Sequence, residues 1–342
     1  MLKGITSPRQ PVISVVGFGF LRWSCFLLAT IYFLLLGGIE GVRPGAAQEK
    51  PVVIGYVARD LNNFPLLLAE ARGFFRDAGI APQLVQMRST VGLAGLQSGS
   101  IDYYSAFVSA IRWAAQGVSL TGVLAMVDKP NFYLVSRPEI RTVADLKGKV
   151  VGVGSIGDIN YIVTQKVLAQ LGLGSADYTI MAAGDFPLRM AALKSGAIQA
   201  TMAAPPAPII AKEWGFNVLA FSGDFVDYPL AGLATTTSKL KAARSEVVSV
   251  IKAILHGLLL IKANRTETVV LIQKLLKMDI KVAEAAYDLS FKSYSFSGAA
   301  SDKGIRNVLD LVQTSGAARQ IAPADVVDFG PLKEAQAALG IR

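Results

Sequence analysis

Hydroxyls, amides and one arginine are the side chains of this sequence best suited to chemistry, and they lie at corresponding positions of two similar stretches. They are Asn62, Asn63, Arg88, Ser89, Thr90 and Ser105 in the first stretch and Ser155 and Asn160 in the second, and the aromatic Phe64 and the carboxylate Asp185 lie beside them in the first and second stretch. Hydroxyls and amides hold a small polar molecule through hydrogen bonds, and an arginine pairs with a carboxylate or sulfonate. The set therefore predicts a binding site for a small, anionic organic solute.

The correspondence is a repeat at a shift of 97 residues, which makes residues 53–114 resemble residues 150–211. Asn63 corresponds to Asn160, and Arg88 corresponds to Asp185. In both stretches the polar residues follow β-branched runs and precede helical spacing, which is where ligands bind in open parallel sheets. Two similar α/β units predict two lobes with a ligand cleft between them.

Several of these residues have a second interpretation. Arg88 either pairs with an anionic ligand, or forms a surface ion pair or a bond to Asp185 across the cleft. Asn63 and Asn160 either contact the ligand or cap helices, because asparagine is favoured at helix starts for local reasons.

Glycines in the segment 152–157 have the spacing of a dinucleotide-binding fingerprint, between a predicted strand and a predicted helix. The acidic residue that this fingerprint needs about 20 residues later is missing, because Asp177 precedes its strand and Asp185 is too distant. We therefore expect the glycines to let the backbone approach a ligand, with Ser155 and the helix N-terminus donating hydrogen bonds to an anionic group.

Catalysis has little support. His256 and Cys25 are the only histidine and cysteine, so no Ser/His/Asp or Cys/His arrangement can form, and metal sites rich in these residues are excluded. Asp158 and Asp185 have no acidic partner at a suitable spacing. We therefore expect no catalytic residue, no metal site and no cofactor.

Residues 1–47 have the pattern of an export signal. Three basic residues precede the apolar run Trp23–Ile39, and small residues follow it up to Ala47. Signal peptidases cleave after small residues, so we expect cleavage near Ala47 and a periplasmic location. The alternative is an uncleaved membrane anchor, because 17 apolar residues are near the lower limit for crossing a bilayer.

The charge does not indicate nucleic acid as a partner. The 342 residues carry a net charge of +9, and removing the leader takes away four cationic and one anionic side chain, which leaves +6. The basic residues are scattered, without the runs or signatures of nucleic-acid-binding proteins. The mature chain has no cysteine, so its stability must come from its core, and its length is ample for that.

Strand and helix patterns alternate along the mature chain, which predicts mostly parallel sheets flanked by helices. We place a first crossover at Arg137 and Pro138, and a returning strand at Leu230–Thr236. The predicted lobes are therefore 51–137 plus 230–342, and 138–229. Two crossing strands then form the hinge.

Five segments in this order resemble the extracytoplasmic solute-binding proteins of ABC importers, in the nitrate, sulfonate and taurine branch that includes relatives of the thiamine-pyrimidine synthesis proteins. They are Ile54–Tyr56, Ala71–Ile80, Leu96–Asp102, Val143–Gly152 and Ala192–Ala200. The resemblance implies a two-lobed periplasmic-binding-protein fold of type II. It also implies a monomer that closes on a small-molecule ligand and delivers it to a membrane permease and its ATPase.

The resemblance leaves the ligand open, because Met87–Thr90 replaces the glycine pair that family members often carry after the second strand. The synthesis enzymes of the group use a histidine and a cysteine cluster, for which this chain has no counterpart in a suitable place. An importer component is therefore expected rather than an enzyme. The alternatives are a membrane-anchored ligand-sensing module and a biosynthetic enzyme on the same fold.

Overall fold

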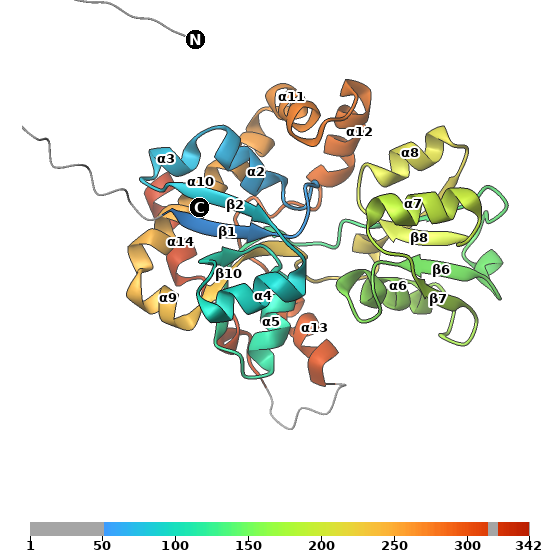
Figure 1. The fold of residues 1–342 in the computed structure, drawn as a ribbon, viewed down its shortest axis with the longest axis horizontal. Helices are drawn as coiled ribbons and strands as arrows, with labels where there is room; N and C mark the ends of the chain where they lie inside the picture. Colours follow the sequence, from blue (N-terminus) through green and yellow to red (C-terminus); the bar gives the residue numbers. More distant parts are fainter. Residues whose placement is uncertain (1–50, 314–320, 342) are drawn as a thin grey trace, which may run out of the picture. The chain divides into compact units, whose positions relative to one another are not determined.

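Two five-stranded sheets organise the chain in the computed structural model, which describes residues 51–313 and 321–341 (Figure 1). The first sheet has the order β2-β1-β3-β10-β4, with β1 at Val52–Tyr56, β2 at Pro82–Gln86, β3 at Tyr103–Tyr104, β4 at Leu120–Val127 and β10 at Ala231–Thr236. The second has the order β7-β6-β8-β5-β9, with β5 at Tyr133–Ser136, β6 at Val150–Val153, β7 at Thr179–Ala182, β8 at Ala200–Ala203 and β9 at Asn217–Phe221.

Helices flank both sheets. Those between strands of the first sheet are α2 (Phe64–Ala71), α3 (Phe74–Asp77), α4 (Ser89–Ser98) and α5 (Phe107–Ala115). Those of the second are α6 (Ile159–Gln170), α7 (Phe186–Ser195) and α8 (Ala207–Glu213), with short 3-10 turns at Ala144–Leu146 and Ser222–Asp224. The C-terminal helices are α9 (Thr237–Ala242), α10 (Arg244–Ala263), α11 (Arg265–Leu276), α12 (Ile280–Phe291), α13 (Asp302–Gln313) and α14 (Gly330–Leu339), with a 3-10 turn at Pro323–Asp325.

The repeat found in the sequence is visible in this element order. Helices α4 and α7 have bounds that differ by the same 97 residues at both ends. Strands β2, β1 and β3 are parallel neighbours in one sheet, as β7, β6 and β8 are in the other. Corresponding strand-end loops of the two repeats therefore occupy equivalent positions in the two sheets.

One strand in each sheet runs against the others. Strand β10 pairs antiparallel with β3 and β4, and β5 pairs antiparallel with β8 and β9. Each reversed strand is the first one after the chain has left the other sheet. Strand β5 of the second sheet follows β4 of the first, and β10 of the first sheet follows β9 of the second. The chain therefore crosses between the sheets twice, through residues 128–132 and 222–230.

The first crossover lies earlier than the sequence pattern predicts. The break at Pro138 predicts that residues up to 137 belong to the first lobe, but β5 belongs to the second sheet. Tyr133 and Val135 of β5 pack in the second core with Phe221. Pro138 therefore marks the end of β5, not a change of sheet. The returning strand predicted at Leu230–Thr236 is present as β10.

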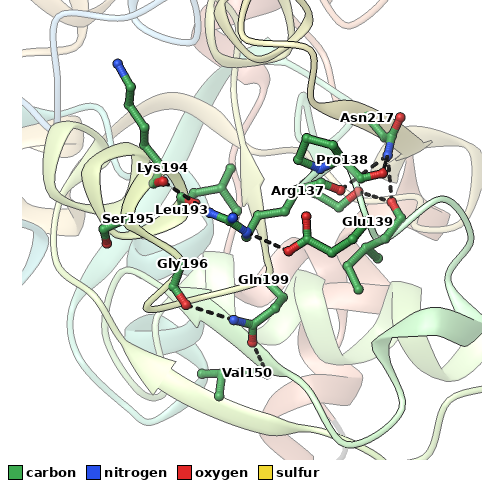
Figure 2. A network of polar contacts seen from close by, with 12 residues as sticks. Arg137, Pro138, Glu139, Val150, Leu193, Lys194, Ser195, Gly196, Gln199 and Asn217 are labelled. Carbon is green, nitrogen blue, oxygen red and sulfur yellow. Dashed lines mark hydrogen bonds and ion pairs between the residues drawn. The ribbon is translucent and has the colours of Figure 1, made fainter.

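A network of polar contacts surrounds Arg137, which follows β5 (Figure 2). Arg137 donates hydrogen bonds to the carbonyl oxygens of Leu193 and Lys194, at 3.0 and 3.1 Å. These are the last carbonyls of α7, which lack partners inside a helix. Arg137 is thus occupied at the far end of α7 from Asp185, and it stabilises the fold.

The C-terminal helices complete the first lobe. Helix α10 packs on α2, α3 and α14, and Ile251, Ile254 and Leu258 on α10 are fully buried. Within the described residues, no helix is both long and apolar enough to span a membrane. The predicted leader lies outside these residues.

Candidate functional site

All ten predicted site residues lie between the end of a strand and the first turn of the next helix. Because β2, β1 and β3 are parallel, the seven residues of the first stretch follow strands that end at one edge of the first sheet. Ser155, Asn160 and Asp185 follow β6 and β7 and lie at the corresponding edge of the second sheet. The topology therefore groups the residues as the strand-end argument requires.

Asp60 orients both asparagines of the first loop. Its Oδ1 accepts hydrogen bonds from the backbone N–H groups of Asn62 and Asn63, both at 3.1 Å, and from Nδ2 of Asn63 at 2.9 Å. Asp60 is half-buried as a residue, and its carboxyl group is the buried part. Burial raises the pKa of this carboxyl group, whereas its hydrogen bonds with Asn63 and Asn62 lower that pKa. Asn62 and Asn63 are themselves buried, and the Oδ1 atom of each has no partner.

Asn160 is arranged like Asn63, to which it corresponds. Its Nδ2 donates to the carbonyl oxygen of Met202 at 2.8 Å, and its buried Oδ1 has no partner. Neither asparagine caps a helix through its side chain: Asn63 occupies the N-cap position of α2 without a cap bond, and Asp158 caps α6. The capping interpretation of both asparagines is therefore wrong.

Three of the predicted residues serve the core. Phe64 is fully buried. The Ser105 hydroxyl, 1% exposed, accepts a hydrogen bond from the backbone N–H of Val57 at 3.2 Å. Ser89 begins α4 and hydrogen-bonds Tyr104, whose own hydroxyl donates to the carbonyl of Met87 at 2.8 Å.

The exposed predicted residues are free for a ligand. Arg88, Thr90 and Ser155 are exposed. Within the described residues, the guanidinium of Arg88 forms no ion pair with Asp185 or with another carboxylate. The side chain of Asp185 caps α7, because it accepts a hydrogen bond from the backbone N–H of Leu188 at 3.3 Å. An ion pair between Arg88 and Asp185 is thus not formed in this structure.

Arg189 is a candidate that the repeat does not reveal, because its counterpart at the shift of 97 residues is Gly92. Its Nη1 donates to the carbonyl oxygen of Gly184 at 2.8 Å, while its Nε is buried without a partner. Burial lowers the pKa of its guanidinium, and the nearby charges of Asp158 and Asp185 counteract this effect. Arg189 therefore places a partly desolvated cation between the ends of β6 and β7.

Contrary to the prediction from the sequence, the glycine segment 152–157 does not leave the N–H groups at the start of α6 free for an anionic ligand. Asp158 accepts the backbone N–H groups of Ser155 and Tyr161, both at 2.7 Å. The N–H groups expected to hold an anion at the start of α6 are thus bonded to the protein's own carboxylate. A Cβ at Gly154 would collide with Asp158 and approach Nη1 of Arg189 to 3.2 Å, so this glycine is needed to bring the two side chains together.

Nine buried side-chain nitrogen and oxygen atoms have no hydrogen-bond partner within the described residues. Four belong to strand-end residues: Asn62, Asn63, Asn160 and Arg189. The other five lie in the crossover segments or against them, on Arg112, Asp128, Asn131, Tyr228 and Ser293. Since most buried polar groups are paired, these atoms at the strand ends and the crossover are candidates for contact with a polar molecule.

Exposed apolar side chains have a similar distribution. Of five large ones in the described residues, four lie at strand ends: Val57, Val91, Ile156 and Leu188. The fifth, Val270, is in α11. Val91 and Leu188 correspond in the repeat and are 57% and 61% exposed in the first turns of α4 and α7. An apolar part of a ligand would find partners beside the polar groups.

Other parts of the described chain offer less. A shallow cavity of about 490 Å³ lies away from the strand ends, against α9 and the turn at Pro323–Asp325, but Arg244 on its rim is paired with Glu334 at 2.6 Å. His256 packs on Phe74, with 5.4 Å between ring centroids. Within these residues no group of three or more histidine, cysteine or acidic side chains is placed to hold a metal ion.

A family model described as NMT1/THI5 like matches residues 60–268. No curated protein sequence matches the chain.

Solved structures resemble the fold over nearly all of their length. The alkanesulfonate-binding protein SsuA from Xanthomonas axonopodis pv. citri, bound to MOPS, is 19% identical, and the match covers 83% of this chain and 99% of that one, with a TM-score of 0.68. The periplasmic nitrate-binding protein NrtA from Synechocystis PCC 6803 is 14% identical over 84% and 89%, with a TM-score of 0.67. The desulfurization enzyme DSZB is 13% identical over 85% and 100%, with a TM-score of 0.61.

Proposed function

Because the chain belongs to the NMT1/THI5-like family, we propose that it is the periplasmic substrate-binding component of an ABC importer for a small, anionic organic solute. The resemblance seen in the sequence and the two-lobed α/β fold are confirmed by this family and by the matching structures. The solute binds between the lobes, at the strand ends and the crossover. Its partners are a membrane permease and the permease's ATPase.

The distribution of unpaired buried polar atoms is the observation that carries this proposal. All nine lie at the strand ends or against the crossover, which is the place where a ligand held by both lobes contacts each of them. Arg189 and Arg88 supply positive charge there, so the solute is anionic. Val91 and Leu188 supply apolar contact, so the solute is organic.

An enzymatic role is the first alternative, because DSZB is an enzyme with a similar fold. Cys25 is the only cysteine and precedes the predicted cleavage site, and His256 is the only histidine and packs on α3. The strand ends instead offer amides, hydroxyls and arginines, which can bind a solute without forming a covalent intermediate. These residues favour binding over catalysis.

The experiment that tests the proposal is thermal unfolding of the chain from Gln48 to Arg342 with sulfonates, carboxylates, nitrate, amino acids and pyrimidines. A ligand that binds only the native state raises the unfolding midpoint with concentration. Stabilisation by organic anions supports the proposal. Stabilisation by pyrimidines alone, or by no compound, contradicts it.

A membrane-anchored sensor is the second alternative, and the N-terminus of the exported protein separates it from the importer component. A start near Gln48 supports a released binding protein, whereas retention of Trp23–Ile39 supports an anchor.

A further inference from the structure

Asn63 and Asn160 present their carbonyl oxygens in the same way at corresponding strand ends of the two sheets. The Nδ2 atom of Asn63 is bonded to Oδ1 of Asp60 at 2.9 Å, and that of Asn160 to the carbonyl oxygen of Met202 at 2.8 Å. Both residues are more than nine-tenths buried, at 3% and 6% exposure. In both, Oδ1 is buried and unpaired.

The orientation of both amides is determined by their anchors. A carboxylate and a backbone carbonyl accept hydrogen bonds but do not donate them. Rotating either amide by half a turn would place its oxygen against the oxygen of Asp60 or Met202. Different anchors in the two lobes therefore enforce the same result, which is a buried acceptor at each strand end.

Acceptors outnumber obligate donors among the nine unpaired atoms. Carbonyl or carboxylate oxygens account for five of the nine, on Asn62, Asn63, Asp128, Asn131 and Asn160, whereas only two are obligate donors, on Arg112 and Arg189. A nitrate ion or a simple alkanesulfonate has no N–H or O–H group at neutral pH. Such an anion can pair with Arg189 but leaves the buried acceptors unpaired, which is unfavourable.

We infer that the solute carries an amino group in addition to its anionic group, and that Asn63 and Asn160 select for this amino group by accepting its N–H hydrogen bonds. This inference rests on the proposed binding function. It places the anionic end of the solute at Arg189 and the amino group at the two asparagines. Asp60 is a positioning residue, because it acts through Asn63.

The test compares matched pairs of anions that differ only in the amino group, by isothermal titration with the chain from Gln48 to Arg342. The pairs are taurine and ethanesulfonate, β-alanine and propionate, and 4-aminobenzenesulfonate and benzenesulfonate. We expect the amino member to bind at least tenfold more tightly in the pair of best-fitting size. Equal or tighter binding of the amino-free members overturns the inference and leaves the anion-binding function standing. Binding of no member in any pair contradicts both.

A substitution assigns the selectivity to the asparagines. In Asn160→Leu we expect the preference for the amino member to fall below threefold, while the affinity for the amino-free member changes less than threefold. Asn217→Leu is the matched control. The Nδ2 atom of Asn217 also donates to carbonyl oxygens, those of Arg137, Pro138 and Ile140, but Asn217 lies at the start of β9, away from the predicted binding loops. An unchanged preference in Asn160→Leu overturns its role. A lost preference in the control as well would mean that the effect is structural.

Discussion

Arg189 and Arg88 are the two arginines at the strand ends, and their surroundings separate their roles. Arg189 is half-buried, bonded to Gly184 and close to two carboxylates. Arg88 is exposed and has no partner in the described residues. A cation that is partly shielded from water attracts an anionic ligand more strongly than an exposed cation, whose attraction is weakened by water and salt.

We therefore predict that Arg189→Gln lowers the affinity for the anionic solute at least tenfold, on the scale of about 1.5 to 3 kcal/mol for a hydrogen bond to a charged group. Arg88→Ala should lower it less, and with a stronger dependence on salt. Isothermal titration at two salt concentrations measures both. Lys274→Gln, an equal change of charge at an exposed position of α11, is the control. A larger loss in Arg88→Ala than in Arg189→Gln would contradict the assignment.

Single residues also show where inference from the sequence ends. The repeat predicted Asn63 and Asn160, because an internal repeat preserves positions. It could not indicate Arg189, whose counterpart is Gly92, nor the anchor Asp60, whose counterpart is Gly157. These two residues matter through contacts that only the folded loops bring about.

At the scale of elements, α4 and α7 present equivalent apolar side chains in their first turns. Leu188 and Val91 project from helices that begin at the ends of β7 and β2. We predict that Leu188→Ser lowers the affinity for benzenesulfonate-sized anions several-fold and leaves that for ethanesulfonate-sized anions nearly unchanged, because only a larger body reaches this side chain. Val270→Ser, at the similarly exposed site in α11, should change neither. Equal losses for small and large anions would argue against an apolar subsite.

Lys239 joins three elements of the first lobe. Its Nζ lies 3.0 Å from Oδ1 of Asp102, after α4, and 2.9 Å from Oε1 of Glu246 in α10, which also accepts the Tyr103 hydroxyl at 2.8 Å. Lys239→Met should lower the free energy of unfolding by about 2 kcal/mol at pH 7, less than for a fully buried pair, because about a quarter of each charged side chain is exposed. Urea unfolding measures this change, and ligand affinity should be unaffected.

The pH dependence of this ion pair has a definite sign. Burial disfavours the charge of Lys239, but its hydrogen bonds and the charges of Glu246 and Asp102 outweigh burial and raise its pKa above the ordinary value of 10.5. The folded chain thus holds this proton more tightly than the unfolded chain. The stabilisation is complete below about pH 10.5 and is lost as the pH rises through the folded-state pKa. The difference between wild type and Lys239→Met should therefore shrink at pH 11, and a constant difference would rule out this source of stability.

The alternation of strands and helices and the returning strand β10 could be predicted from periodicity and breaks. Residues 64–75 have the spacing of a single helix, but the structure divides them into α2 and α3 because Gly73 adopts a left-handed conformation, with φ at 78°. Strand β5 was assigned to the wrong sheet for another reason. A short buried strand has the same apolar pattern in either sheet, so only its pairing with β8 and β9 decides where it belongs.

At the scale of the whole molecule, the two crossover segments are bonded to each other. The Ser222 hydroxyl donates to the carbonyl of Pro130 at 2.7 Å and accepts the backbone N–H of Phe132 at 3.1 Å. Further along, the N–H of Leu230 bonds the carbonyl of Val127 at 2.8 Å. We propose that these tied segments bend as a unit and form the hinge, because a hinge moves two lobes without breaking either core.

Ligand binding should therefore make the chain more compact. A ligand shifts a two-state equilibrium only as far as its affinities for the two states differ, and a solute held by Arg189 and Asn160 on one lobe and by Asn63 on the other gains its full set of contacts only when the lobes are closed. We predict that the radius of gyration of the chain from Gln48 to Arg342, measured by solution scattering, decreases at saturating concentrations of the best-binding amino-bearing anion. Arg189→Gln should require a higher concentration for the same decrease, because it weakens binding and not the hinge. An unchanged radius under saturating ligand would mean that one lobe alone holds the solute, and the hinge would then have no part in binding.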